Sequence, residues 1–169
     1  RSIPLLALLL GMLAASEAQS KSPRTTPEMR QLEAMSLDEL DALYTEGGVE
    51  RLPVGTARGK VIVFVDAKFP KAKAARANLF WRGKEFDCDG EFVNQFLGFQ
   101  ALHSKAEIRP SWFDGKPTIQ LEYPPKTPIF GNTHDEIREI GPNLFLGRVY
   151  DKEPCPRFRG YFVLQTCDR

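Results

Sequence analysis

The chain has 169 residues, 42% of them hydrophobic, and its 23 basic and 22 acidic residues give a formal net charge of +1. This length is sufficient to bury the core of one domain. The balance of charge argues against a nucleic-acid-binding protein, which usually has a strongly basic face.

The N-terminal segment has the pattern of a targeting sequence. Arg1 precedes an apolar run from Ile3 to Ala15, and Ser16-Glu17-Ala18 follows it. This order of basic, apolar and small residues is typical of a signal peptide, and the run is too short to span a bilayer. We therefore expect a signal peptide over residues 1–18 and a secreted or periplasmic mature chain without stable membrane insertion.

The mature chain is predicted to begin with a flexible segment followed by a short helix. Residues 19–35 are polar and contain two prolines, which is typical of a flexible N-terminus. Ser36-Leu37-Asp38-Glu39 then has the pattern of a capping box, and apolar residues follow at helical spacing until Gly47-Gly48. We expect this helix to lie against the outside or across one mouth of a single domain formed by residues 36–169.

The rest of the chain is rich in strand patterns separated by turn residues. An Ala-rich stretch over 71–79 favours a helix. The predicted strands are 59–66, 79–86, 91–97, 101–109, 117–123, 134–140, 144–150 and 159–166. This pattern predicts a mainly β fold, a closed or nearly closed antiparallel barrel of about eight strands with one or two short helices. Closure removes exposed strand edges, and such a barrel can enclose one small ligand.

The predicted hairpin over residues 134–150 contains most of the candidate ligand-binding residues. Glu136 and Arg138 share one face of the first strand, and Ile137 lies on the other face. If the Ile137 face is external, Glu136 and Arg138 point into the barrel and can bind a polar head group; the alternative is a solvent-facing charged strand. Arg148 and Tyr150 share a face of the second strand and can join them in the same cavity.

The two tryptophans complete the set of candidate ligand-binding residues. Trp81 begins a strand, where it lines a pocket or plugs the barrel. Trp112 lies near a strand end and is a candidate for the mouth. The histidines, His103 and His134, have no partner pattern that would mark a general base, so no catalytic residue is predicted.

Cysteine spacing predicts one disulfide and no metal site. The three cysteines are Cys88, Cys155 and Cys167. Cys155 and Cys167 would lie at opposite ends of the last strand, roughly 35 Å apart at ~3.3 Å per residue, which is too far for a bridge. The preferred pair is therefore Cys88 with Cys167. No CxxC is present, and neither histidine stands at ligand spacing to a cysteine.

Three motifs give the chain a resemblance to known proteins. They are WRGKEFD (81–87), PSWFDGKPTIQLEY (110–123) and DEIREIGPNLFLGRVY (135–150). The set, over roughly residues 50–166, resembles an uncharacterised group of small proteins of bacteria and eukaryotes, to which no activity is attached. More loosely, the pattern is similar to calycin-type barrels such as lipocalins and fatty-acid-binding proteins. The lipocalin Gly-x-Trp of the first strand is absent, as is the C-terminal His of nitrobindin-like haem barrels, so no cofactor is expected.

These observations predict a secreted small β-barrel that binds a small hydrophobic or amphipathic molecule. Two alternatives remain open at this point. One is an enzyme of the same fold that uses an interior Arg, Tyr and carboxylate, and the other is a plugged structural or interaction barrel. A filled interior would exclude ligand binding, and a pocket carboxylate with a raised pKa would favour the enzyme.

Overall fold

The computed structural model describes residues 26–127 and 130–166. The predicted signal peptide, most of the predicted flexible segment and Cys167 lie outside these ranges.

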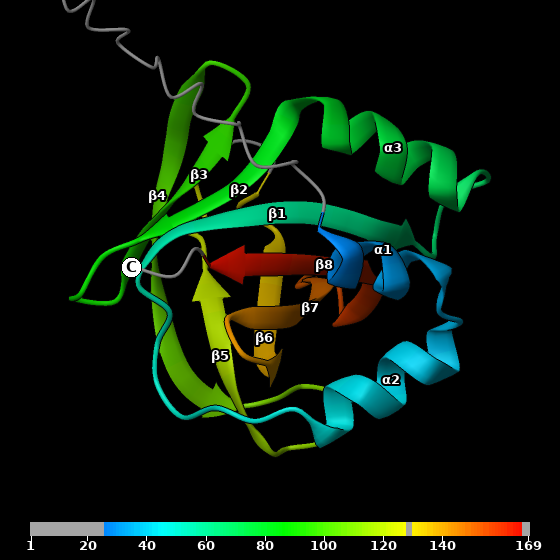
Figure 1. Cartoon of the computed structure of the whole chain (residues 1–169). Coiled ribbons are helices and arrows are strands. Elements are labelled where there is room, and N and C mark those ends of the chain that lie inside the picture. Colours follow the sequence, from blue (N-terminus) through cyan, green and yellow to red (C-terminus); the bar gives the residue numbers. More distant parts are fainter. Residues whose placement is uncertain (1–25, 128–129, 167–169) are drawn as a thin grey trace, which may run out of the picture.

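Eight antiparallel strands close into one barrel in sequence order, with the last strand paired to the first (Figure 1). This confirms the predicted fold class. Turn residues such as Gly90, Gly98 and Asn143 connect neighbouring strands with positive φ angles. The strands are β1 (Gly55–Phe64), β2 (Trp81–Phe86), β3 (Glu91–Phe96), β4 (Phe99–Pro110), β5 (Pro117–Glu122), β6 (Thr133–Gly141), β7 (Leu144–Asp151) and β8 (Arg157–Thr166).

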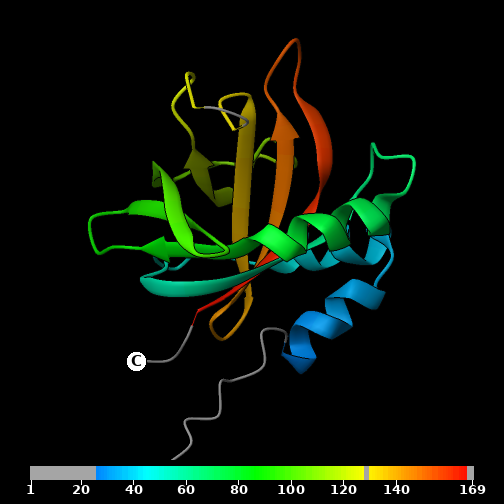
Figure 2. The same ribbon diagram turned by 90° about the horizontal axis from the view of Figure 1, so that it is seen from above.

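Three helices lie along one side of the barrel (Figures 1 and 2): α1 (Pro27–Ala34), α2 (Leu37–Glu46) and α3 (Pro70–Phe80). The predicted capping box of α2 is present, with Ser36 and Glu39 bonded reciprocally. α1 falls in the segment predicted to be flexible. Thr26 caps it, a proline occupies its first turn, and its Met29 is fully buried against the barrel wall. None of the helices in the described ranges is both long and apolar enough to cross a membrane.

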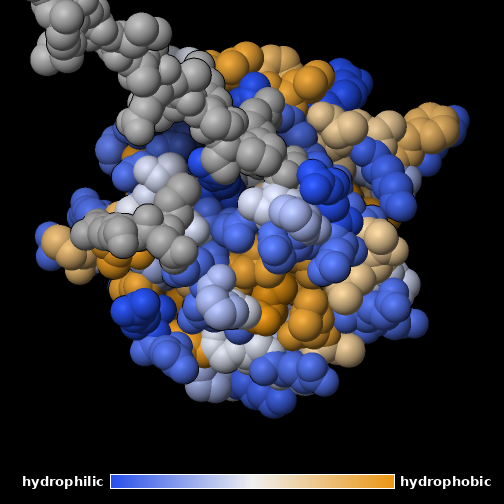
Figure 3. Space-filling view, in the orientation of Figure 1, coloured by the Kyte–Doolittle hydropathy of each residue, from blue (hydrophilic) through white to orange (hydrophobic). Residues whose placement is uncertain are grey.

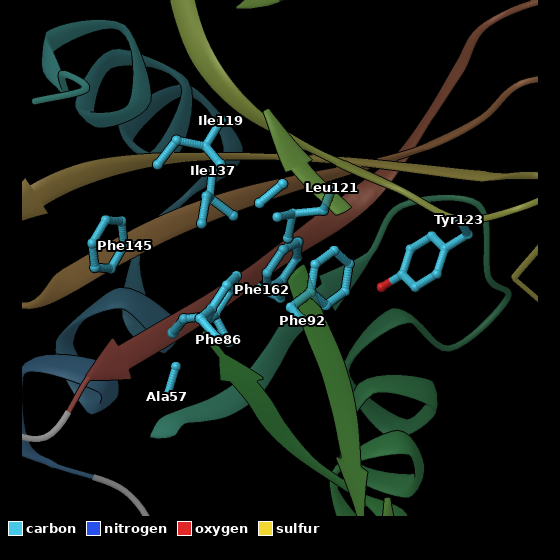
Figure 4. Close-up of a cluster of buried hydrophobic side chains, with 11 residues drawn as sticks. Ala57, Phe86, Phe92, Ile119, Leu121, Tyr123, Ile137, Phe145 and Phe162 are labelled. Carbon is cyan, nitrogen blue, oxygen red and sulfur yellow. The ribbon is translucent and has the colours of Figure 1, made fainter. Parts of the chain in front are cut away.

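The barrel wall is buried on both sides where the helices cover it. Inside, an apolar cluster fills one end of the barrel. Figure 4 shows its rings and branched side chains converging from several strands. Outside, Leu146, Tyr161 and Val163 pack against Leu40 and Tyr44 of α2. Successive residues of β6, β7 and β8 therefore alternate between two different cores.

Strand register divides the barrel interior into a packed end and an open end. Ala57, Phe86, Phe92, Ile137 and Phe145 close one end. Gly147 makes this packing possible, because a Cβ at that position would lie 2.2 Å from the Phe162 ring. The interior positions further along the strands toward α3 are not filled in this way.

The structure shows no disulfide among the described residues. Cys88 lies in the turn between β2 and β3 and Cys155 in the turn between β7 and β8, and both are free, exposed thiols. Cys167, the predicted partner of Cys88, lies outside the described residues.

Candidate functional site

The face of β6 that points into the barrel is the Ile137 face, not the face that carries Arg138. Ile137 is fully buried in the interior cluster, so the neighbouring Glu136 and Arg138 point to the outer side of the wall. They are nevertheless not exposed to solvent: α2 and the turn between β4 and β5 cover both side chains, which have 0% exposure. The outer face of β6 is thus a second buried layer, not a charged surface.

Arg138 holds this layer together. Its guanidinium makes a bidentate ion pair with Asp114 at 2.6 and 2.8 Å. Its remaining N–H groups donate to the carbonyl oxygens of Pro117, Tyr44 and Lys116 at 3.0 to 3.2 Å. An arginine has five N–H donors, so none is left to bind a ligand.

Glu136 is saturated in the same way. Its carboxylate accepts from the hydroxyl of Ser111 at 2.5 Å and from the backbone N–H of Trp112 at 2.6 Å. Nε2 of His134 lies 3.1 Å from the Glu136 carboxylate, and Nδ1 of the same ring lies 2.7 Å from the Glu122 carboxylate. The Trp112 ring stacks on the imidazole with the ring centroids 3.7 Å apart. Burial alone would lower the pKa of His134, but the hydrogen bonds to the two carboxylates raise it.

Arg148 and Tyr150 join this outer layer next to α2. The Arg148 guanidinium bonds Asp41 of α2 and the hydroxyls of Tyr150 and Tyr161. It also lies over the rings of Phe113, at 3.8 Å, and Phe158. Five predicted ligand-binding residues, Glu136, Arg138, Arg148, Tyr150 and Trp112, therefore lie in this outer layer and not in a cavity of the barrel.

A cavity of about 400 Å³ lies on the other side of the wall, inside the open end of the barrel. Of the predicted ligand-binding residues, only Trp81 lines it. Gly59 makes room for the indole, since a Cβ there would lie 2.4 Å from the ring. The other apolar lining residues are Val61, Phe64, Ala77, Phe130, Val149 and Phe162.

Four polar side chains meet at the wall of this cavity. The Lys84 ammonium donates to Asn94 Oδ1 at 2.9 Å and to the Tyr123 hydroxyl at 2.5 Å. Tyr123 in turn donates to Asp135 Oδ2 at 3.1 Å, which lies 3.6 Å from Lys84 Nζ. The second oxygen, Asp135 Oδ1, is buried and has no hydrogen-bond partner among the residues that the structure describes. We call these residues, Lys84, Asn94, Tyr123 and Asp135, the interior polar cluster.

Burial perturbs the titration of the whole interior polar cluster. It lowers the pKa of Lys84 to about 8, against the opposing charge of Asp135. Burial raises the pKa of Asp135, although the charge of Lys84 opposes the rise. Burial and the charge of Asp135 together raise the pKa of Tyr123 well above its usual value. Perturbed groups of this kind concentrate at functional sites.

The sequence analysis assigned no role to any member of the interior polar cluster. A signal for Lys84 was present in the alternation of WRGKEF, where Lys84 and Phe86 share a face. The cluster itself depends on the pairing of β2 with β3 and of β5 with β6, which brings distant segments together.

No family model matches the chain, and no curated protein matches its sequence. Among solved structures, the chain is similar to one titled "Crystal structure of protein from Thermomonospora curvata". The TM-score is 0.57 and the identity 17%, over 83% of this chain and 97% of that one. At this identity the similarity shows the fold alone.

Proposed function

We propose that this protein binds a small amphipathic molecule in the cavity at the open end of the barrel. The observation that carries the proposal is Asp135 Oδ1, a buried oxygen without a donor among the described residues, on a residue that lines a mainly apolar cavity. A buried acceptor without a donor costs about 1–3 kcal/mol. A ligand that brings a donor would recover this free energy while its apolar part covers the surrounding rings.

The charges of the interior polar cluster favour a neutral head group. A ligand carboxylate would add a second negative charge beside Asp135, and a ligand ammonium would add a second positive charge beside Lys84. A hydroxyl group adds neither charge, and it can donate a hydrogen bond to Asp135 Oδ1. At about 30 Å³ per group, the share of one liquid water, the 400 Å³ cavity holds on the order of a dozen non-hydrogen groups.

The test is isothermal calorimetry with four probes of equal chain length: 1-decanol, decanoate, decylamine and the headless decane. We expect 1-decanol to bind best, by roughly 5–150-fold over decane, which corresponds to the cost of an unsatisfied buried group. Asp135→Asn should weaken 1-decanol binding, and Glu107→Gln, which changes an exposed carboxylate on β4, is the matched control. Equal affinity for all four probes, or no binding, would refute the proposal.

A second candidate function is an enzyme of the same fold, supported by the lowered pKa of Lys84, about 8, and the raised pKa of Asp135. Such a pair can remove a proton from a bound ligand and return one. 2-Decanone incubated in D₂O should then exchange protons next to its carbonyl faster with the wild type than with Lys84→Met. Equal exchange rates would exclude this role.

We also propose that the protein is secreted, on the basis of the apolar Ile3–Ala15 segment and its flanks. Expression of the chain behind an initiator methionine should release a product that starts at Gln19. Retention of an uncleaved chain inside the cell would contradict this.

A further inference from the structure

An apolar patch lies on the outer face of α3 and the adjacent turn between β3 and β4. Five large side chains there, Phe69, Leu79, Phe80, Leu97 and Phe99, are between 59% and 67% exposed. The backbone N–H of Leu97 donates to the carbonyl of Phe80 at 2.8 Å, so the C-terminal end of α3 lies next to the turn. Figure 3 shows hydrophobic surface over the β3–β4 turn, at the top of the view. Exposed groups of this size on a folded domain mark interaction surfaces.

The charge around this patch has one sign. α3 contains Lys71, Lys73 and Arg76 and no acidic residue, and Lys68 precedes it. At 100° per residue, Arg76 shares the outward side of the helix with Leu79 and Phe80. Lys68 and Phe69, which directly precede the helix, are exposed as well. Asp66 is paired at 2.8 Å with Arg159 and at 3.6 Å with Lys73.

We propose that this patch, Phe69, Leu79, Phe80, Leu97 and Phe99 with the flanking Lys68 and Arg76, binds the surface of a membrane that contains anionic lipid. Basic residues attract anionic head groups, and apolar residues between them insert into the interface region. This contact is peripheral, since the side chains belong to a short helix and a turn.

The arrangement of the patch favours a lipid surface over a protein. Phe69 stands at one end of α3, and the other four apolar side chains stand at the opposite end, with Arg76 between them. A protein interface needs a desolvated apolar centre with matching shape, whereas separate side chains can insert into lipid without one.

The neighbouring cavity also favours a membrane contact, an inference that rests on the proposed function. The other side of α3 contributes Lys73 and Ala77 to the cavity lining, beside Phe64, Asp151 and Arg159 at the ends of their strands. A helix that contacts the membrane with one side and the cavity with the other would place the opening where an amphipathic ligand is dissolved.

The test is co-sedimentation of the full chain with vesicles of phosphatidylcholine, with or without about one-third phosphatidylserine. We expect binding to the anionic vesicles that weakens as salt is added. Lys68→Glu/Arg76→Glu should lower the partition coefficient at least tenfold, and so should Leu79→Ser/Phe80→Ser. The matched controls are Lys105→Glu and Ile108→Ser, which change exposed residues of β4 far along the strand from Phe99.

Absence of binding to anionic vesicles would overturn the proposal, as would binding that the patch variants leave unchanged. Wild-type dimers in analytical ultracentrifugation that Leu79→Ser/Phe80→Ser dissociates would also overturn it and assign the patch to a second copy of the chain. Calorimetry with 1-decanol on the same variants separates the two proposals, because the patch variants should keep their 1-decanol affinity.

Discussion

Lys84 and Asp135 form a buried charge pair that can be removed one member at a time or together. Lys84→Met keeps an unbranched side chain but leaves the Asp135 carboxyl without a cation. The folded protein can then protonate Asp135, which sets an upper limit on the electrostatic cost. From the ordinary carboxyl pKa of 3.8 to pH 7, this costs about 4.4 kcal/mol at about 1.36 kcal/mol per pH unit. We therefore expect a loss of about 3–4 kcal/mol, which lies in the range for a broken buried ion pair.

The pH dependence of this loss has a definite sign. Burial raises the pKa of Asp135, and Lys84→Met removes the charge that opposes the rise. A carboxyl with a higher pKa in the folded state destabilises the fold increasingly as pH rises above the unfolded value. At pH 5 the upper limit on the electrostatic cost falls to about 1.6 kcal/mol. The free energy of unfolding of Lys84→Met should therefore lie closer to that of the wild type at pH 5 than at pH 7.

The double variant Lys84→Met/Asp135→Asn decides the cause. It removes both charges and keeps an amide oxygen that accepts from Tyr123. Replacing both members of a buried pair is often neutral or stabilising, so we expect a stability near that of the wild type together with weakened 1-decanol binding. Urea denaturation followed by tryptophan fluorescence, with m-values compared, measures this. A double variant as unstable as Lys84→Met would refute the reasoning, because lost packing would then account for the loss.

Arg138→Met should cost about 3–5 kcal/mol, since it leaves Asp114 and three carbonyls without their donor, and should not change the 1-decanol affinity of the folded protein; weakened binding would instead support the sequence-based ligand role. The raised pKa of His134 means that its stabilisation is complete below the ordinary value of 6.5 and is lost as pH rises through the folded value. Between pH 6 and pH 9 the free energy of unfolding, measured by denaturation, should therefore fall more for the wild type than for His134→Gln. Leu146→Ala should cost about 2–5 kcal/mol, because the side chain is fully buried; a loss below about 0.5 kcal/mol would contradict that burial.

The sequence alone determined the fold of this protein to the level of its elements. Alternating apolar residues and turn residues predicted all eight strands, because side-chain alternation and turn chemistry are local properties of the chain. The even spacing of the strands predicted closure. The capping box of α2 was equally readable, because Ser36 and Glu39 are three residues apart. α1 was missed although Thr26-Pro27 is a helix start, because its polar composition resembled that of a flexible segment.

Only the tertiary structure decided which face of each strand belongs to the cavity. Alternation assigns Ile137 and Arg138 to opposite faces but cannot say which is interior when both are buried, as they are here. The outer face of β6 is covered by α2 and by the turn between β4 and β5, which are distant in sequence. Five candidate ligand-binding residues are therefore buried in this outer layer, where they stabilise the barrel wall. Lys84, Tyr123 and Asp135 meet only because closure brings β2, β5 and β6 around one interior. No local pattern encodes that distance, which is why the cavity and its unpartnered carboxylate oxygen could not be predicted from the sequence.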